Sequence, residues 1–188
     1  MTAMDVTDPA PDSVEHSALI DGLVRRTPDF PRPGILFHDI TTVLADPAAW
    51  QTTIHACARA ARPFAPDVIV GIESRGFILG ATLAYELGLG FIPIRKPGKL
   101  PYQVHSLDYE LEYGTDTLEV HIDAVGPGHR VLIVDDLLAT GGTANAAAEL
   151  IERCGADAVG LLVLIELQEL RGRDKLPPGL AVTSILSY

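Results

Sequence analysis

The sequence predicts an α/β protein with a mostly parallel central sheet and helices on both of its faces. Short apolar runs that suit buried strands alternate with segments whose apolar residues recur at helical spacing. Glu73, Arg95 and Asp135 each fall at the end of an expected strand, which is where ligands bind in such sheets. The 188 residues show no internal repeat and no linker, and they suffice for one domain with a full core.

The first expected helix covers residues 17–26, where apolar residues recur at helical spacing. Residues 27–34 contain three prolines and a glycine and are therefore expected to be irregular. Asp46 is a suitable N-cap for a helix over residues 47–62, because Pro47 can occupy its first turn. The remaining expected elements are strands over residues 68–71, 91–95, 118–122, 131–134 and 159–164, a helix over residues 76–87 that ends at Gly88, a loop over residues 97–103, and a helix over residues 144–153.

Composition excludes several classes of protein. The formal net charge of −11 argues against a nucleic-acid binder, which needs a basic face for backbone phosphates. The longest apolar run, residues 158–165, is far shorter than the ~20 residues that span a bilayer, so no membrane contact is expected. Residues 1–16 are acidic and contain prolines, which predicts a disordered or variable lead-in to a domain over residues 17–188 and no targeting signal. Cys57 and Cys154 are too isolated for a disulfide frame or a zinc site, and the default location is cytoplasmic.

The run from Val131 to Ala144 carries the strongest functional signal. A buried strand leads into Asp135 and Asp136, and a small-residue loop then opens a helix. Backbone N–H groups and the dipole at that helix start bind anions, and glycine lets the backbone approach a phosphate closely. We therefore expect a sugar phosphate here, with the acids accepting from ribose hydroxyls. The loop residues that would hold the phosphate are Ala139, Thr140, Gly141, Gly142 and Thr143.

A plainer interpretation of the same run is a strand, a turn with two solvated acids and a helix capped by threonine. That interpretation would be preferred for the two aspartates alone, but the whole run favours the phosphate site. The nucleotide P-loop and the dinucleotide G-x-G-x-x-G fingerprint are both absent from the sequence.

Two further loops carry cations. Residues 71–77 (GIESRGF) lie between a strand and a helix, and Arg75 stands beside backbone N–H groups that could bind an anion. An ordinary loop with a surface arginine is an equal alternative for this segment. Arg95, Lys96 and Lys99 lie in a loop stiffened by two prolines, and this density of cations suits a diphosphate. A solvated basic loop would be favoured if this segment stood alone.

Two more segments have both a functional and a structural interpretation. Residues 107–114 (LDYELEYG) could close over a substrate and deliver a carboxyl group, although their alternating pattern favours an edge strand. In residues 30–40, Phe37 could stack on a planar base. A phenylalanine between Leu36 and His38 is more often a core residue, and a lone histidine is more often structural.

Together these segments resemble the adenine phosphoribosyltransferase family, a branch of the type I phosphoribosyltransferases, from about Asp29 to Lys175. The matching segments are residues 29–31, 33–35, 37, 39–41, 73–77, 95–96, 98–101, 111–114, 134–143 and 165–167. The resemblance implies one type I phosphoribosyltransferase domain with a small hood and a flexible catalytic loop. The implied reaction is purine salvage, in which adenine and 5-phosphoribosyl 1-diphosphate give AMP and diphosphate. It also implies a homodimer, and magnesium that is carried on the diphosphate rather than by direct protein ligands.

The resemblance also implies roles for single residues. Glu112 would exchange a proton with the purine ring, and Tyr113 would help to cover the site. The diphosphate would meet Arg75, Arg95 and Lys99, with Arg95 from this subunit or from the other. The adenine-binding residues would be Leu36, Phe37 and His38. Relatives often have arginine where this chain has His38, so a base contact there would depend on pH.

Two rival functions fit parts of the sequence. A phosphoribosyltransferase for another base, such as xanthine or orotate, would share the sugar-phosphate half of the site. A transcription regulator that senses phosphoribosyl diphosphate would need a DNA-reading domain. The 28 residues before the first family motif leave no room for a helix-turn-helix, and no basic face is present.

Overall fold

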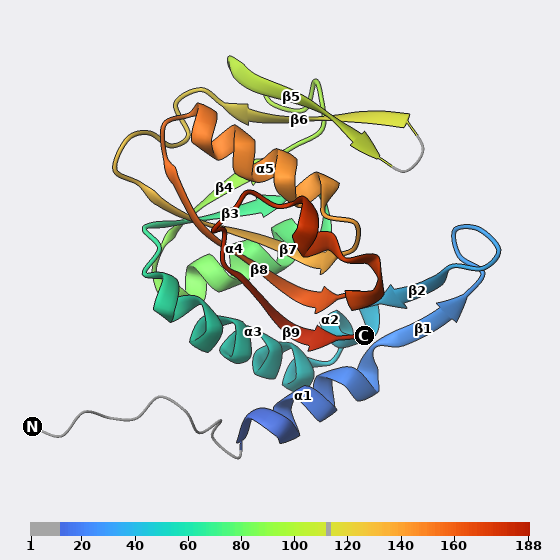
Figure 1. Ribbon diagram of the computed structural model, residues 1–188. Coiled ribbons are helices and arrows are strands. Elements are labelled where there is room, and N and C mark those ends of the chain that lie inside the picture. Colours follow the sequence, from blue (N-terminus) through green and yellow to red (C-terminus); the bar gives the residue numbers. More distant parts are fainter. Residues whose placement is uncertain (1–11, 112–113) are drawn as a thin grey trace, which may run out of the picture. The chain divides into compact units, whose positions relative to one another are not determined.

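The computed structural model describes residues 12–111 and 114–188 (Figure 1). The chain divides into two compact units, residues 1–56 and 57–188, and each is described by itself. The expected domain boundary at residue 17 stays a prediction. Most of the expected lead-in, residues 1–11, lies outside the described residues.

The first unit contains a small antiparallel hairpin. In order it holds α1 (Asp12–Leu23), β1 (Arg25–Pro28), β2 (Leu36–Asp39), α2 (Thr41–Ala45) and the first part of α3 (Pro47–Ala61). The helix expected over residues 17–26 therefore starts earlier and stops at Leu23. Arg25 and Arg26, which were expected to be helical, pair instead with Asp39 and His38 of β2, and this pairing also draws Thr27 and Pro28 out of the expected irregular segment.

The second unit is built on a five-stranded sheet in the order β4-β3-β7-β8-β9, and every neighbouring pair in it is parallel. This confirms the predicted fold class. The elements in chain order are η1 (Arg62–Phe64), β3 (Val68–Ile72), α4 (Arg75–Leu87), β4 (Gly90–Ile94), β5 (Val104–Leu111), β6 (Gly114–His121), β7 (Arg130–Leu138), α5 (Gly142–Arg153), β8 (Asp157–Glu166), η2 (Gln168–Leu170), η3 (Gly172–Lys175) and β9 (Val182–Ser187).

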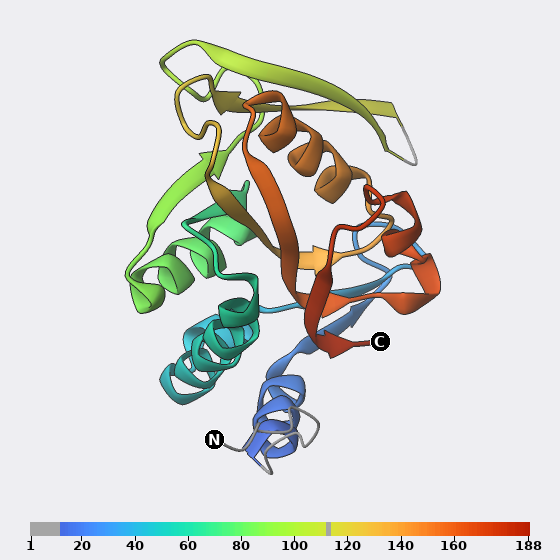
Figure 2. The ribbon, with the colours of Figure 1, turned by 60° about the vertical axis from the view of Figure 1, so that its left-hand side comes forward.

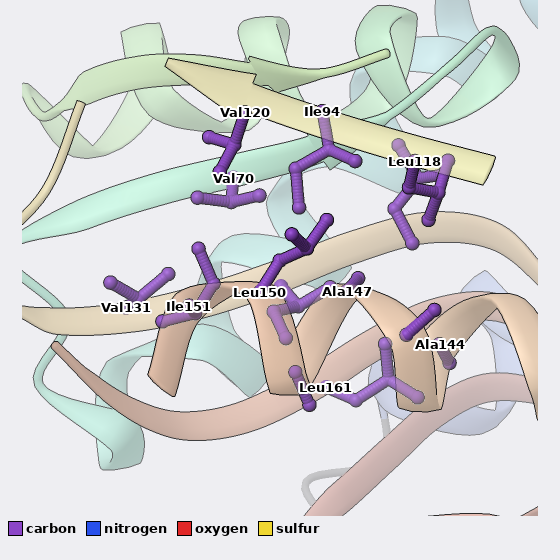
Figure 3. Packing of buried hydrophobic residues seen from close by; sticks show 14 of the residues in the cluster. Val70, Ile94, Leu118, Val120, Val131, Ala144, Ala147, Leu150, Ile151 and Leu161 are labelled. Atoms are coloured by element: carbon purple, nitrogen blue, oxygen red, sulfur yellow. The ribbon is translucent and has the colours of Figure 1, made fainter. Parts of the chain in front are cut away.

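The helices α5 and α4 cover opposite faces of this sheet. Val70 and Ile133 belong to the hydrophobic cluster that α5 helps to form (Figure 3). On the other face α4 approaches closely, because a Cβ at Gly71 of β3 would lie 2.8 Å from the Gly76 carbonyl oxygen. The β5–β6 hairpin lies over α5 in both views (Figures 1 and 2), and Leu118 joins the same cluster. Gly88 has a φ of 69° and ends α4 as predicted.

Two strand predictions were wrong by several residues in extent, and one strand was missed. β7 was expected to stop at Val134, but it continues to Leu138, because Leu137 and Leu138 pair with Ile165 and Glu166 of β8. The two aspartates therefore lie within the strand. β6 begins at Gly114 rather than Leu118, since its first half pairs with β5, and this pairing confirms the edge-strand interpretation up to Leu111. β9 was not predicted at all, and it is held by parallel pairing with β8.

Candidate functional site

A cavity of about 390 Å³ opens at the carboxyl ends of β3 and β7, which is a volume suited to a small ligand. Its lining comprises residues 73–75, Lys96, Tyr109, Asp116, Leu118 and residues 135–144. The two loops that were predicted to bind anions, the one around Arg75 and the one over residues 139–143, thus meet at one cavity. This is the edge of the sheet where the fold class predicts a ligand.

All five residues of the predicted phosphate loop, Ala139–Thr143, line the cavity. Gly141 has a φ of 84° and precedes α5, which starts at Gly142 rather than at the expected Ala144. The first helical bond joins the Asn145 N–H to the Gly141 carbonyl at 2.9 Å. The amide groups before it belong to the helix turn whose N–H groups lack acceptors within the helix, so they are suited to an anion.

The glycines of this loop are required by packing as well as by a ligand. A Cβ at Gly141 would collide with the carbonyl of Gly172, and a Cβ at Gly172 would collide with the carbonyl of Ala139. A Cβ at Gly142 would lie 3.0 Å from the Glu110 carbonyl oxygen. The sequence argument gave close approach of a phosphate as the reason for Gly141 and Gly142, and the structure adds the crossing of two backbones.

The paired aspartates differ in their surroundings. Asp136 is buried and accepts a hydrogen bond from Nε of Arg75. The Asp136 N–H donates to Oδ1 of Asp135 at 2.9 Å. Burial, together with the negative charge of Asp136, raises the pKa of Asp135 well above its ordinary value. A carboxyl group with a perturbed pKa in a cleft is typical of a functional site.

Glu73 forms hydrogen bonds and ion pairs with the cationic loop that follows β4. Its Oε2 accepts from Nε of Arg95 and from the Lys96 N–H, both at 3.1 Å, and its Oε1 lies 3.7 Å from Nζ of Lys99. Burial by itself opposes ionisation of Glu73, but the bonds from Lys96 and Arg95 hold its pKa below the ordinary value. Of the predicted diphosphate cations, Arg75 lines the cavity, whereas Arg95 and Lys99 lie around Glu73.

Three further polar side chains line the cavity: Lys96 and Tyr109, which lie in segments that the sequence had singled out without giving them individual roles, and Asp116, which was missed. Nζ of Lys96 lies 2.7 Å from Oδ2 of Asp116. The Tyr109 hydroxyl lies 3.5 Å from the same oxygen and accepts from Oγ1 of Thr143 at 3.4 Å. The network thus joins the cationic loop to the phosphate loop. Lys96 belongs to the basic run that was expected to suit a diphosphate, whereas the sequence gives no signal for Asp116.

The other predicted site residues lie elsewhere or are not described. Glu112 and Tyr113 lie outside the described residues, between β5 and β6. Leu36, Phe37 and His38 are on β2 of the first unit, where Phe37 packs edge-to-face on Phe30 with ring centroids 5.0 Å apart. His38 is buried, and burial followed by the charge of Arg26 lowers its pKa. Its burial favours the structural interpretation of this histidine.

The fold and the cavity define a phosphoribosyl-transferring enzyme, and comparison with known proteins agrees. Residues 40–179 match the family described as the phosphoribosyl transferase domain. The chain belongs to this family. In the ranges 12–111 and 114–188, no helix has both the length and the apolar character needed to cross a bilayer.

The similar proteins narrow the family further. An adenine phosphoribosyltransferase of Synechococcus sp. is 60% identical over 166 residues, which is 88% of this chain and 96% of that protein. The crystal structure of the adenine phosphoribosyltransferase of Thermoanaerobacter pseudethanolicus is 50% identical, with a TM-score of 0.89 over 92% of this chain and 99% of that one.

A third similar protein has been solved with ligands. The Saccharomyces cerevisiae adenine phosphoribosyltransferase, complexed with an imino-altritol bisphosphate and adenine, is 40% identical, with a TM-score of 0.87 over 92% of this chain and 99% of that one. Within its family the chain therefore belongs to the adenine phosphoribosyltransferases, which perform purine salvage by converting adenine and 5-phosphoribosyl 1-diphosphate to AMP.

Proposed function

We propose that the cavity at the ends of β3 and β7 is where this chain transfers the phosphoribosyl group from 5-phosphoribosyl 1-diphosphate to adenine, giving AMP and diphosphate. One observation carries the assignment to this cavity: the start of α5, the two aspartates and Arg75 line the same space. A phosphate site, hydroxyl acceptors and a cation are the three groups that a phosphorylated, activated ribose requires.

In this proposal Ala139–Thr143 hold the 5′-phosphate, and Asp135 and Asp136 accept from the ribose hydroxyls. Breaking the anomeric bond builds positive charge on the ribose ring. The two carboxylates beside the sugar favour that charge, because they are fixed in the cavity before the reaction starts. Exclusion of water protects the same sugar cation from hydrolysis.

The diphosphate leaves with increased negative charge and needs cations. Arg75, Arg95 and Lys99 are proposed to meet it, and Lys96 joins them because it lines the cavity. Magnesium, carried on the diphosphate, would neutralise part of the charge of the leaving group. Among residues 12–111 and 114–188 no group of three or more His, Cys, Asp or Glu side chains could hold a metal ion, which fits a magnesium ion that is held by diphosphate oxygens and water rather than by the protein.

The adenine half of the site rests on the family resemblance. Phe37 would stack on the base, Leu36 would recognise its edge through the backbone, and His38 would lie near it. Glu112 would exchange a proton with the purine ring, and Tyr113 would help to cover the site. Glu112→Gln is expected to lower turnover by about 10²-fold or more, because a general acid–base group contributes on that scale. Affinity for 5-phosphoribosyl 1-diphosphate should stay nearly unchanged, and unchanged turnover would remove Glu112 from this role.

A homodimer and a cytoplasmic location are also proposed. Light scattering after size-exclusion chromatography would test the dimer, and a monomer mass at working concentration would contradict it. Both Cys57 and Cys154 are free thiols, as is usual in a reducing compartment.

A base-selectivity assay tests the proposed reaction. The protein is incubated with magnesium, 5-phosphoribosyl 1-diphosphate and one of adenine, hypoxanthine, guanine, xanthine or orotate, and the nucleotide product is separated by chromatography. AMP should form from adenine at the highest rate, and omission of magnesium should suppress it. Failure to form AMP, or a faster reaction with xanthine or orotate, would contradict the proposal.

A further inference from the structure

The phosphate loop is supported from behind by the segment that follows β8. The Leu167 N–H donates to the Leu138 carbonyl at 2.9 Å, just before the loop begins. Farther along the segment, Gly172 lies so close to Ala139 and Gly141 that a Cβ on either glycine would collide with the opposite backbone. The position of Gly172 therefore limits where the backbone of the loop can lie.

The residue after Gly172 makes a bidentate ion pair with the end of β8. Nε and Nη2 of Arg173 each lie 2.6 Å from a separate oxygen of Glu166, which is the last residue of β8. The Glu166 side chain is 7% exposed and also accepts from Oγ of Ser184 on β9 at 2.9 Å. Nη1 of Arg173 donates to the Val182 carbonyl at 3.3 Å. Arg173 is thus fixed to β8, which is the neighbour of β7, and to β9 beyond it.

The stability of the fold does not by itself explain this arrangement. Glu166 is buried while Arg173 is half-exposed, and an ion pair with a buried member is often no more stabilising than apolar residues of the same size, because the buried charge loses its hydration. A paired guanidinium and carboxylate does fix geometry, since two parallel hydrogen bonds allow one orientation. Here the fixed residue adjoins the glycine that touches the phosphate loop.

We propose that Glu166 and Arg173 are positioning residues, which hold Gly172 behind the phosphate loop and so orient its amide groups for the 5′-phosphate. The inference rests on the proposed binding of that phosphate by Ala139–Thr143. Neither side chain lines the cavity, so both act through the backbone of Gly172. Loss of the pair lets Gly172 and the loop shift, and a misplacement of about 1 Å can change activity by about 10²-fold.

Binding of two ligands to one set of variants tests the proposal. Ribose 5-phosphate probes the phosphate loop, and magnesium diphosphate probes the loop around Arg75; both are titrated by calorimetry. Arg173→Met and Glu166→Gln should bind ribose 5-phosphate on the order of tenfold to a hundredfold more weakly and diphosphate as wild type does. Arg173→Lys, which keeps the charge but not the fork, should be intermediate. In steady-state kinetics the KM for 5-phosphoribosyl 1-diphosphate should rise while that for adenine stays constant.

Asp174→Asn is the matched control. It removes an ion pair from the same segment, that of Arg171 with Asp174 at 2.6 Å, but both of those side chains are exposed. This variant should bind both ligands as wild type does. If Arg173→Met fails to fold, Arg173→Lys and Ser184→Ala decide the question, because each weakens the arrangement without leaving a buried charge unpaired.

Each outcome has one meaning. Wild-type affinity of the folded Arg173 and Glu166 variants for ribose 5-phosphate would overturn the inference, and so would equal weakening of both ligands. If the wild-type protein itself binds no ribose 5-phosphate, the proposed function of the loop is wrong and the inference falls with it.

Discussion

The two sides of the phosphate loop place carboxyl groups in opposite electrostatic situations. On the cavity side, Asp135 lies next to Asp136, and burial with this like charge raises its pKa. On the other side, the hydrogen bonds from Arg173 lower the pKa of Glu166. The cavity side therefore keeps unrelieved charge repulsion between two acids, whereas the acid on the rear side has its hydrogen bonds satisfied within the protein. Unfavourable electrostatic interactions of this kind between buried groups are typical of functional sites.

The pairing of β7 with β8 explains why these differently placed carboxyl groups lie close together. β7 and β8 are parallel neighbours, and Leu138 pairs with Glu166. β7 carries its two acids three and two residues before that point, and Arg75 donates a hydrogen bond to Asp136. β8 ends on a single acid that receives a complete guanidinium fork. We expect loss of a carboxylate to stabilise the fold on the cavity side and to destabilise it on the rear side, and we expect variants on both sides to weaken ligand binding.

The largest effect is expected for the double variant Asp135→Asn with Asp136→Asn. Each hydrogen bond between a hydroxyl and a charged carboxylate is worth about 1.5–3 kcal/mol, so affinity for 5-phosphoribosyl 1-diphosphate should fall by about 10²- to 10⁴-fold. Calorimetric titration measures it. Unchanged affinity would show that the cavity side does not hold the ribose, and it would contradict the assignment of a ligand-binding role to that side.

The next effect is on stability at the rear of the loop. Glu166→Gln should lower the free energy of unfolding by about 2 kcal/mol near neutral pH, because it weakens two hydrogen bonds to a charged partner. The folded-state pKa of Glu166 is depressed, so its contribution is present above the ordinary value of 4.5 and is lost as the pH falls through the depressed value. Urea titrations across that range should show the two proteins converging in acid. A difference in the free energy of unfolding that stays constant as the pH falls would contradict the predicted pH dependence.

A smaller effect of opposite sign is expected for Asp135→Asn alone. The pKa of Asp135 is raised in the folded state, so its ionisation opposes folding from the ordinary value of 3.8 upward and does so fully above the raised value. The variant should therefore be more stable near neutral pH by about 1 kcal/mol, with a Tm higher by about 2–4 °C. The gain should vanish in acid. A less stable variant near neutral pH would show that ionisation of Asp135 does not oppose folding.

The smallest effect is expected for Asp116→Asn. Nζ of Lys96 lies 2.7 Å from Asp116, but the Lys96 side chain is 52% exposed, so water and salt screen the pair. Loss of the pair should change the free energy of unfolding by about 0.5 kcal/mol or less, and the difference should fade at high salt. Thermal melts at two salt concentrations measure it, beside the exposed control Asp174→Asn. A loss as large as that of Glu166→Gln would mean that the cavity side is also structural.

Local patterns in the sequence predicted those parts of the protein that depend on neighbouring residues. The apolar run before Asp135, the small residues up to Thr143 and the helix after them predicted the phosphate loop, and all of that loop lines the cavity. Gly88 likewise predicted the end of α4, because glycine readily adopts the left-handed conformation that ends many helices. Periodicity, capping and backbone freedom act within a few residues, so they can be recognised without the fold.

The contacts between segments that are distant in the sequence depend on tertiary packing. Pairing with β8 extends β7 through its two aspartates, and pairing with β5 extends β6 back to Gly114. The same long-range packing placed Asp116 in the cavity and Gly172 against Gly141. Strand register and backbone crossings arise from residues far apart in the chain, and a local pattern does not contain them.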